Sequence, residues 1–80
     1  MKLNPIKSNM NELELNDKVI LFSYQTPVAM CDYSNIYKTD KYYSQTTTKH
    51  INQWANMRNT SKDELLTISQ LELNNLVESV

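Results

Sequence analysis

The chain contains no glycine in its 80 residues. Glycine adopts a positive φ without steric cost, and phosphate-binding loops need it so that the backbone can approach a nucleotide closely. A glycine-rich nucleotide-binding loop is therefore excluded, and other residues must make the turns. Asparagine and aspartate tolerate the left-handed region best, so we expect turns at Asn16–Asp17, Ser34–Asn35 and Asn59.

The length predicts one small domain over residues 1–80. Such a chain buries only roughly 60% of the surface that its unfolded form exposes, so its stability is marginal. Cys31 is the one cysteine and His50 the one histidine, so neither an intramolecular disulfide nor a zinc cluster can add stability. We therefore predict no cofactor and no metal, and we expect a homodimer, since burial between two copies would add apolar contact.

The first part of the chain has the pattern of a sheet. Residues 1–10 read as an extended lead-in, because Pro5 restricts regular structure there. The segment 11–45 is predicted to be an antiparallel β-meander with strands near 12–15, 18–24, 28–33, 36–39 and 41–44. The strand at 18–24 is apolar on both faces, which places it centrally in the sheet.

The second part, residues 46–80, is predicted to be helical. Threonines 46–48 can cap a helix that ends at Arg58 and buries Ile51, Trp54 and Ala55. A short strand is expected within 64–68, because residues 69–72 have the capping-box pattern of a separate last helix. The side chains that this last helix is expected to bury are Leu73, Leu76, Val77 and Val80.

One long helix from Ser61 to the end of the chain is the alternative for this region, with Glu64 completing a capping box at its start. Under either reading the fold class is α+β, a small antiparallel β-meander packed against one or two short C-terminal helices.

Charge and hydropathy argue against two classes of partner. The net charge of −1 argues against a strongly basic nucleic-acid-binding domain, although Lys38, Lys41, Lys49 and Arg58 make the middle of the chain basic. No apolar run approaches the ~20 residues that a membrane span needs, so no membrane contact is predicted. A free cysteine fits a reducing compartment, which favours the cytoplasm.

The residues give little sign of catalysis. His50 is the one candidate general base near neutral pH, with the threonines 46–48 before it and Asp40 as a possible neighbour in the fold. We interpret His50 as a packing or contact residue and Cys31 as a buried, inert thiol. Glu12 and Glu14 are read as the solvent face of an edge strand. We therefore predict no catalytic residue and no enzymatic activity.

The aromatic residues indicate a contact surface. There are five tyrosines and one tryptophan, and tyrosine, tryptophan and arginine are the residues that dominate protein interfaces. We expect Trp54 and one of Tyr42 and Tyr43 in the core. The candidate interaction surface consists of Tyr33, Tyr37, Lys38, Lys41, Tyr42, Tyr43, Lys49, His50 and Arg58.

Two segments have a distinctive sequence: F-S-Y-Q-T-P-V-A at residues 22–29 and T-T-T-K-H-I-N-Q-W at residues 46–54. Both resemble blocks shared by a family of short proteins of tailed bacteriophages, for which no catalytic activity is known. Tyr43–Ser44 stands before the second block, where Trp-Ser is more usual in the family. The resemblance implies a phage origin and no functional residues.

The resemblance leads to a functional hypothesis. Small phage proteins of this kind often act on a host protein, so we expect an accessory protein that binds and inhibits one in the host cytoplasm. A component of a restriction-like, BREX or CRISPR defence system is a plausible partner. The alternatives are a single-stranded nucleic-acid-binding protein that uses Tyr37, Lys38, Lys41, Tyr42 and Tyr43, and a minor virion or assembly component.

Overall fold

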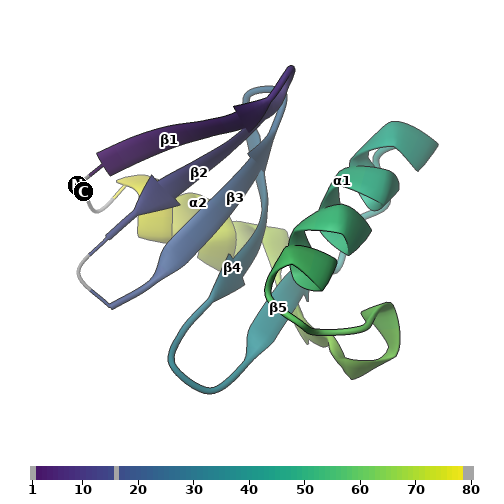
Figure 1. Cartoon of the computed structure of the whole chain (residues 1–80). Helices are drawn as coiled ribbons and strands as arrows, with labels where there is room; N and C mark the ends of the chain where they lie inside the picture. The colour runs from purple at the N-terminus through teal and green to yellow at the C-terminus, as the bar shows by residue number, and fades with distance from the viewer. Residues whose placement is uncertain (1, 16, 79–80) are drawn as a thin grey trace.

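A six-stranded sheet carries one helix on each of its faces (Figure 1). The computed structural model describes residues 2–15 and 17–78. The elements in chain order are β1 (Lys2–Lys7), β2 (Met10–Glu14), β3 (Val19–Ser23), β4 (Thr26–Cys31), β5 (Ile36–Thr39), α1 (Gln45–Met57), the 3-10 turn η1 (Lys62–Glu64), β6 (Leu66–Ile68) and α2 (Gln70–Glu78).

The strands lie in the sheet in the order in which they occur in the chain. Strands β1 to β5 are antiparallel to their neighbours, and β6 pairs with β5 in parallel, after α1 has crossed between them. The predicted α+β class is confirmed, as are the internal position of β3 and the separate strand and helix at the C-terminal end. The antiparallel meander is extended by one parallel strand.

Two segments of the sheet differ from the prediction. Residues 2–10 are not a lead-in, because Lys2–Lys7 forms β1, where Pro5 lies opposite Asn11, and Met10 begins β2. An edge strand tolerates proline, since one side of its backbone needs no partner. Residues 41–44 form no strand. The chain turns after β5, where the amide of Lys41 donates to Thr39 Oγ1 at 3.1 Å.

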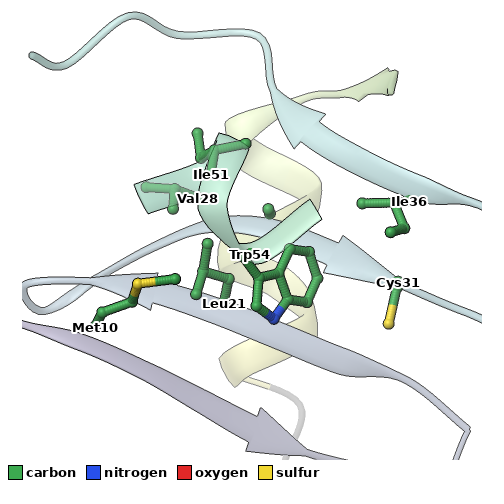
Figure 2. Close-up of a cluster of buried hydrophobic side chains, with 8 residues drawn as sticks. Met10, Leu21, Val28, Cys31, Ile36, Ile51 and Trp54 are labelled. Carbon is green, nitrogen blue, oxygen red and sulfur yellow. The ribbon is translucent and has the colours of Figure 1, made fainter. Parts of the chain in front are cut away.

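The apolar side chains form two clusters, one on each face of the sheet. Under α1 the buried residues include Met10, Leu21 and Val28 from the strands and Ile51 and Trp54 from the helix (Figure 2). Under α2 the cluster consists of Leu13, Ile20, Met30 and Leu73. The apolar strand β3 is thus covered on both faces within one copy of the chain, which removes that part of the argument for a homodimer.

Helix α1 begins and ends with local hydrogen bonds. Ser44, and not one of the predicted threonines, is its N-cap, since its side chain accepts from the amide of Thr47 at 3.1 Å. At the other end, Asn59 has a φ of 59°, and the amide of Thr60 donates to the carbonyl of Ala55 at 2.9 Å. This is a Schellman arrangement with asparagine in the position that glycine usually takes, and the predicted turn at Asn59 is confirmed.

Helix α2 starts at the cap that its sequence predicts. The amide of Glu72 donates to Ser69 Oγ at 3.1 Å, and Leu73 is fully buried. Leu76 and Val77 pack against the same cluster, whereas the predicted burial of Val80 and the predicted turn residue Asn16 lie outside the described residues. A left-handed φ at Asn9 (63°) and at Tyr24 (59°) was not predicted.

Candidate interaction surface

The nine predicted surface residues do not form one surface. Tyr33 and Arg58 lie at the end of the sheet where β5 begins. The segment 41–43 follows the other end of β5. Tyr42 and Tyr43 are both exposed there, so the prediction that one of them lies in the core is wrong. The remaining members are Tyr37, which packs with the cluster under α2, Lys38 and Lys49, which are exposed, and His50, which is buried.

His50 is part of a buried polar network and offers no surface contact. Its Nδ1 lies 2.8 Å from Ser23 Oγ, which lies 3.1 Å from Thr47 Oγ1. The ring of Tyr24 is 6.0 Å away, centroid to centroid. Burial is the main cause that lowers the pKa of His50, and the positive charge of Lys7 lowers it further.

This network differs from the arrangement that catalysis would need. Ser23 is only 2% exposed. The carboxylate of Asp40, the expected acidic neighbour of His50, accepts instead from the amide of Gln70 at 3.1 Å, at the start of α2. The side chain of Gln70 is held in turn by Thr39 Oγ1 at 2.6 Å. Asp40 and Gln70 therefore join β5 to α2.

The end of the sheet around Tyr33 is hollowed, and we call it the loop-end surface. Its residues are Cys31, Asp32, Tyr33, Ser34, Asn35, Arg58, Thr60 and Glu64. It contains a recess of about 300 Å³, and a second recess of about 250 Å³ extends toward Leu15 and Val19. Tyr33 lines both recesses and is 91% exposed.

Arg58 is held in place at the loop-end surface. Its guanidinium lies 4.9 Å from the centroid of the Trp54 ring and forms an ion pair with Glu12. The same Glu12 oxygen accepts from Trp54 Nε1 at 2.7 Å. The prediction that Glu12 lies on the solvent face of an edge strand is therefore wrong. Strand β2 lies between β1 and β3, and the side chain of Glu12 contacts Trp54 of α1. No local sequence pattern indicates this contact, since the partners of Glu12 are 42 and 46 residues away.

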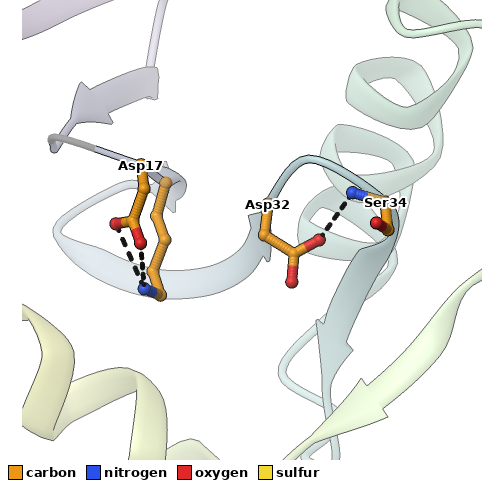
Figure 3. A network of polar contacts seen from close by, with 4 residues as sticks. Asp17, Asp32 and Ser34 are labelled. Atoms are coloured by element: carbon orange, nitrogen blue, oxygen red, sulfur yellow. Dashed lines mark hydrogen bonds and ion pairs between the residues drawn. The ribbon is translucent and has the colours of Figure 1, made fainter.

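Two loops shape the loop-end surface (Figure 3). Asp32 accepts from the amides of Ser34 and Asn35, both at 2.9 Å, and these bonds are the main cause that lowers the pKa of its carboxyl. The predicted turn at Ser34–Asn35 is therefore confirmed, with Asp32 as its stabilising side chain. On the neighbouring loop, the Lys18 ammonium pairs with Asp17 at 3.1 Å.

Cys31 lines both recesses. It is buried, as predicted, and burial is the main cause that raises the pKa of its thiol, while Arg58 opposes that shift. A raised pKa keeps the thiol protonated at neutral pH, and a protonated thiol is a poor nucleophile.

A groove of about 500 Å³ lies beside the loop-end surface, between α2 and the sheet, and we call it the α2 groove. Its apolar residues are Met30, Tyr37, Ile68 and Leu76, and its polar residues are Lys18, Asp32, Thr67, Ser69, Glu72 and Asn75. Lys18 and Asp32 also line the second recess, so the groove and the loop-end surface are continuous.

The fold and these surfaces define a small α+β domain with a sheet between two helices and a recessed end. Over residues 1–75 the chain matches a family of unknown function (DUF8033), and it belongs to that family. Neither a curated protein nor a solved structure matches it.

Two further observations concern ligands and membranes. Within residues 2–15 and 17–78, no three His, Cys, Asp or Glu side chains are grouped so that they could hold a metal ion. In the same part of the chain, neither helix is long and apolar enough to cross a membrane.

Proposed function

We propose that this chain is a bacteriophage accessory protein that binds and inhibits a host protein in the host cytoplasm. The phage origin rests on the two sequence blocks at residues 22–29 and 46–54. The partner we favour is a component of an anti-phage defence system of the restriction-like, BREX or CRISPR kind, because small phage proteins without catalytic activity often act against such systems.

The loop-end surface is the observation that carries the proposed binding role. An almost fully exposed tyrosine beside an arginine that is already fixed in position has the composition of an interface hot spot. Because Trp54 and Glu12 hold Arg58, little side-chain entropy is lost when a partner binds it. The two recesses beside Tyr33 can accept side chains of the partner.

The arrangement of the tyrosines favours a protein over single-stranded nucleic acid. Base stacking on a sheet needs an open face with aromatic side chains, and here a helix covers each face. Tyr37 and Lys38 are adjacent in β5 and so point to opposite faces of the sheet. Tyr42 and Tyr43 lie in the loop after β5. The tyrosines and lysines proposed for nucleic acid therefore form no continuous platform.

Affinity purification from phage-infected cells tests the proposed function. An affinity-tagged chain is expected to recover one host protein in stoichiometric amount, and Tyr33→Ala is expected to lower the recovery at least tenfold, as for a hot-spot residue. Tyr42→Ala is the matched control, because Tyr42 is also exposed but lies at the other end of β5. Its recovery should equal that of the wild type.

The outcomes separate the candidate functions. Recovery of no host protein, or equal recovery with both variants, would contradict binding through the loop-end surface. Mass spectrometry of purified virions tests the virion alternative, which predicts that the chain is a constituent of the particle. A mobility shift with single-stranded DNA that weakens as salt increases would favour the nucleic-acid alternative.

A further inference from the structure

Within the part of the chain that the structure describes, strand β6 presents a free backbone edge. It is the last strand in the sheet order, and β5 pairs with one side of it only. The carbonyl of Ile68 accepts from the amide of Asp40 at 2.9 Å, so the backbone groups of Ile68 point toward the β5 side. Backbone groups alternate in direction from one residue of a strand to the next. The N–H and C=O of Thr67 therefore point away from the sheet.

The apolar side chains beside this edge lie on the face that α2 covers. Ile68 packs with the cluster under α2, and Leu66, two residues earlier in the strand, shares that face and is 45% exposed. The α2 groove reaches the edge, since Thr67 and Ile68 line it, and continues inward to Met30 and Tyr37. A strand added to β6 would thus place alternate side chains against Leu66 and over the groove.

The two edges of the sheet differ in their capacity to accept another strand. The opposite edge is β1, which contains Pro5, a residue without an N–H donor, and lysines at both of its ends. Proline and lysine are features that discourage pairing at a sheet edge. Strand β6, of sequence Leu-Thr-Ile, contains no proline and no charged residue. The β6 edge is therefore the one suited to pairing.

The charges around the α2 groove indicate what kind of strand it accepts. Its charged side chains are those of Lys18, Asp32 and Glu72. The carboxylate of Asp32 accepts from two backbone amides, which lower its pKa, and the Lys18 ammonium, which pairs with Asp17, helps to lower it further. Two carboxylates against one ammonium leave the lining of the groove with an excess of negative charge, and Glu72 is exposed. A segment with cationic side chains is complementary to this excess, and an anionic segment is repelled.

We propose that the β6 edge and the α2 groove bind an extended segment of the partner protein by strand addition, a segment with alternating apolar residues flanked by lysine or arginine. In this mode the backbone hydrogen bonds provide affinity and the groove provides selectivity for the side chains. The inference rests on the proposed function for the existence of a partner, and on the continuity of the groove with the loop-end surface.

Peptide binding to the isolated protein tests this site. The probe is a fluorescent peptide of sequence Lys-Val-Thr-Val-Thr-Val-Lys, and the comparison peptide has glutamate in place of both lysines. The protein variants are Thr67→Pro, which removes the outward N–H, and Thr67→Val, which keeps it. Proline is tolerated on an edge strand when its nitrogen faces outward, and circular dichroism checks that the variant is folded.

We expect the lysine peptide to bind wild type and Thr67→Val with equal affinity. It should bind Thr67→Pro roughly tenfold more weakly, because that variant loses one backbone hydrogen bond to the peptide and weakens the adjacent ones. The glutamate peptide should bind wild type at least tenfold more weakly than the lysine peptide. Glu72→Lys, an exposed change on α2, should reduce this preference.

Three outcomes would overturn the proposal. The first is that the lysine peptide does not bind, and the second is that the Thr67→Pro and Thr67→Val variants bind it equally. The third is that no peptide binds but the chain forms a dimer, and Thr67→Pro abolishes that dimer. The last outcome would make a second copy the occupant. Affinity purification of the host partner with the tagged Thr67→Pro variant distinguishes the strand-addition proposal from the proposed function. Full recovery of the partner with failed peptide binding would remove the strand-addition site alone, and peptide binding without any host partner would remove the proposed function alone.

Discussion

Replacement of Glu12 by alanine should be among the most destabilising single changes outside the apolar core. One oxygen of Glu12 accepts from Trp54 Nε1 at 2.7 Å and from Arg58, and its side chain is 15% exposed. The change would leave an indole N–H without its acceptor in a residue that is fully buried, and would leave Arg58 without its carboxylate.

The magnitude follows from these contacts. A hydrogen bond to a charged group contributes about 1.5–3 kcal/mol, and a partly exposed ion pair adds about 0.2–1 kcal/mol. We therefore expect Glu12→Ala to lower the free energy of unfolding by about 2–3 kcal/mol. For a domain of this size, that corresponds to a decrease in Tm of roughly 10–20 °C.

Thermal and urea unfolding, followed by circular dichroism, measure this effect. Glu12→Gln keeps an acceptor for Trp54 but removes the charge, so it should cost about 1 kcal/mol. Glu14→Ala is the matched control on the same strand, because Glu14 is exposed and contacts Asn4, so it should change the stability by less than about 0.5 kcal/mol. Equal destabilisation by Glu12→Ala and Glu14→Ala would refute the reasoning.

Three other changes can be checked by the same unfolding measurements. Because the pKa of His50 is lowered in the folded state, the folded protein disfavours the imidazolium. Stability should be complete above the ordinary histidine pKa of about 6.5 and should fall as the pH drops below it, whereas His50→Gln should show a weaker decrease. Leu73→Ala should cost about 2–5 kcal/mol, since Leu73 is fully buried, and Leu71→Ala, at an exposed position of the same helix, less than about 0.5 kcal/mol. Asn59→Ala should cost about 1 kcal/mol and Asn59→Gly should cost nothing, because the residue has a φ of 59°; equal stability of these two variants would contradict the left-handed cap.

Local sequence patterns predicted most of the elements because those patterns depend on neighbours. The periodicity around Trp54 and the cap at Ser69 identified α1 and α2, and the two-sided apolar pattern identified β3 as internal. Strand β1 was missed because Pro5 was read as a sign of irregular structure, and its tolerance depends on its place at the sheet edge.

Features that depend on distant contacts were not predictable in this way. The pairing of β3 with β4 shifts register after Leu21, so Val28 packs in the cluster under α1 together with Ala29, although simple alternation places these two residues on opposite faces. His50 was interpreted as a packing or contact residue; the structure buries it, and its hydrogen-bond partner Ser23 is 27 residues away. In the candidate site, Tyr33 and Arg58 were predicted as members, but their proximity and the role of Glu12 come from the tertiary structure.

The parallel pairing of β6 with β5 has a consequence for the order in which the chain assembles. Strands β2 to β5 each pair with the preceding strand across a short connection, whereas β6 must wait until the segment 40–65 has formed α1 and returned to the sheet. Closing a long segment costs more entropy than closing a hairpin, so we expect β6 and α2 to join last. Until they do, Leu13, Ile20 and Met30 lack their cover, and in the native state this C-terminal unit should open more readily than the hairpins.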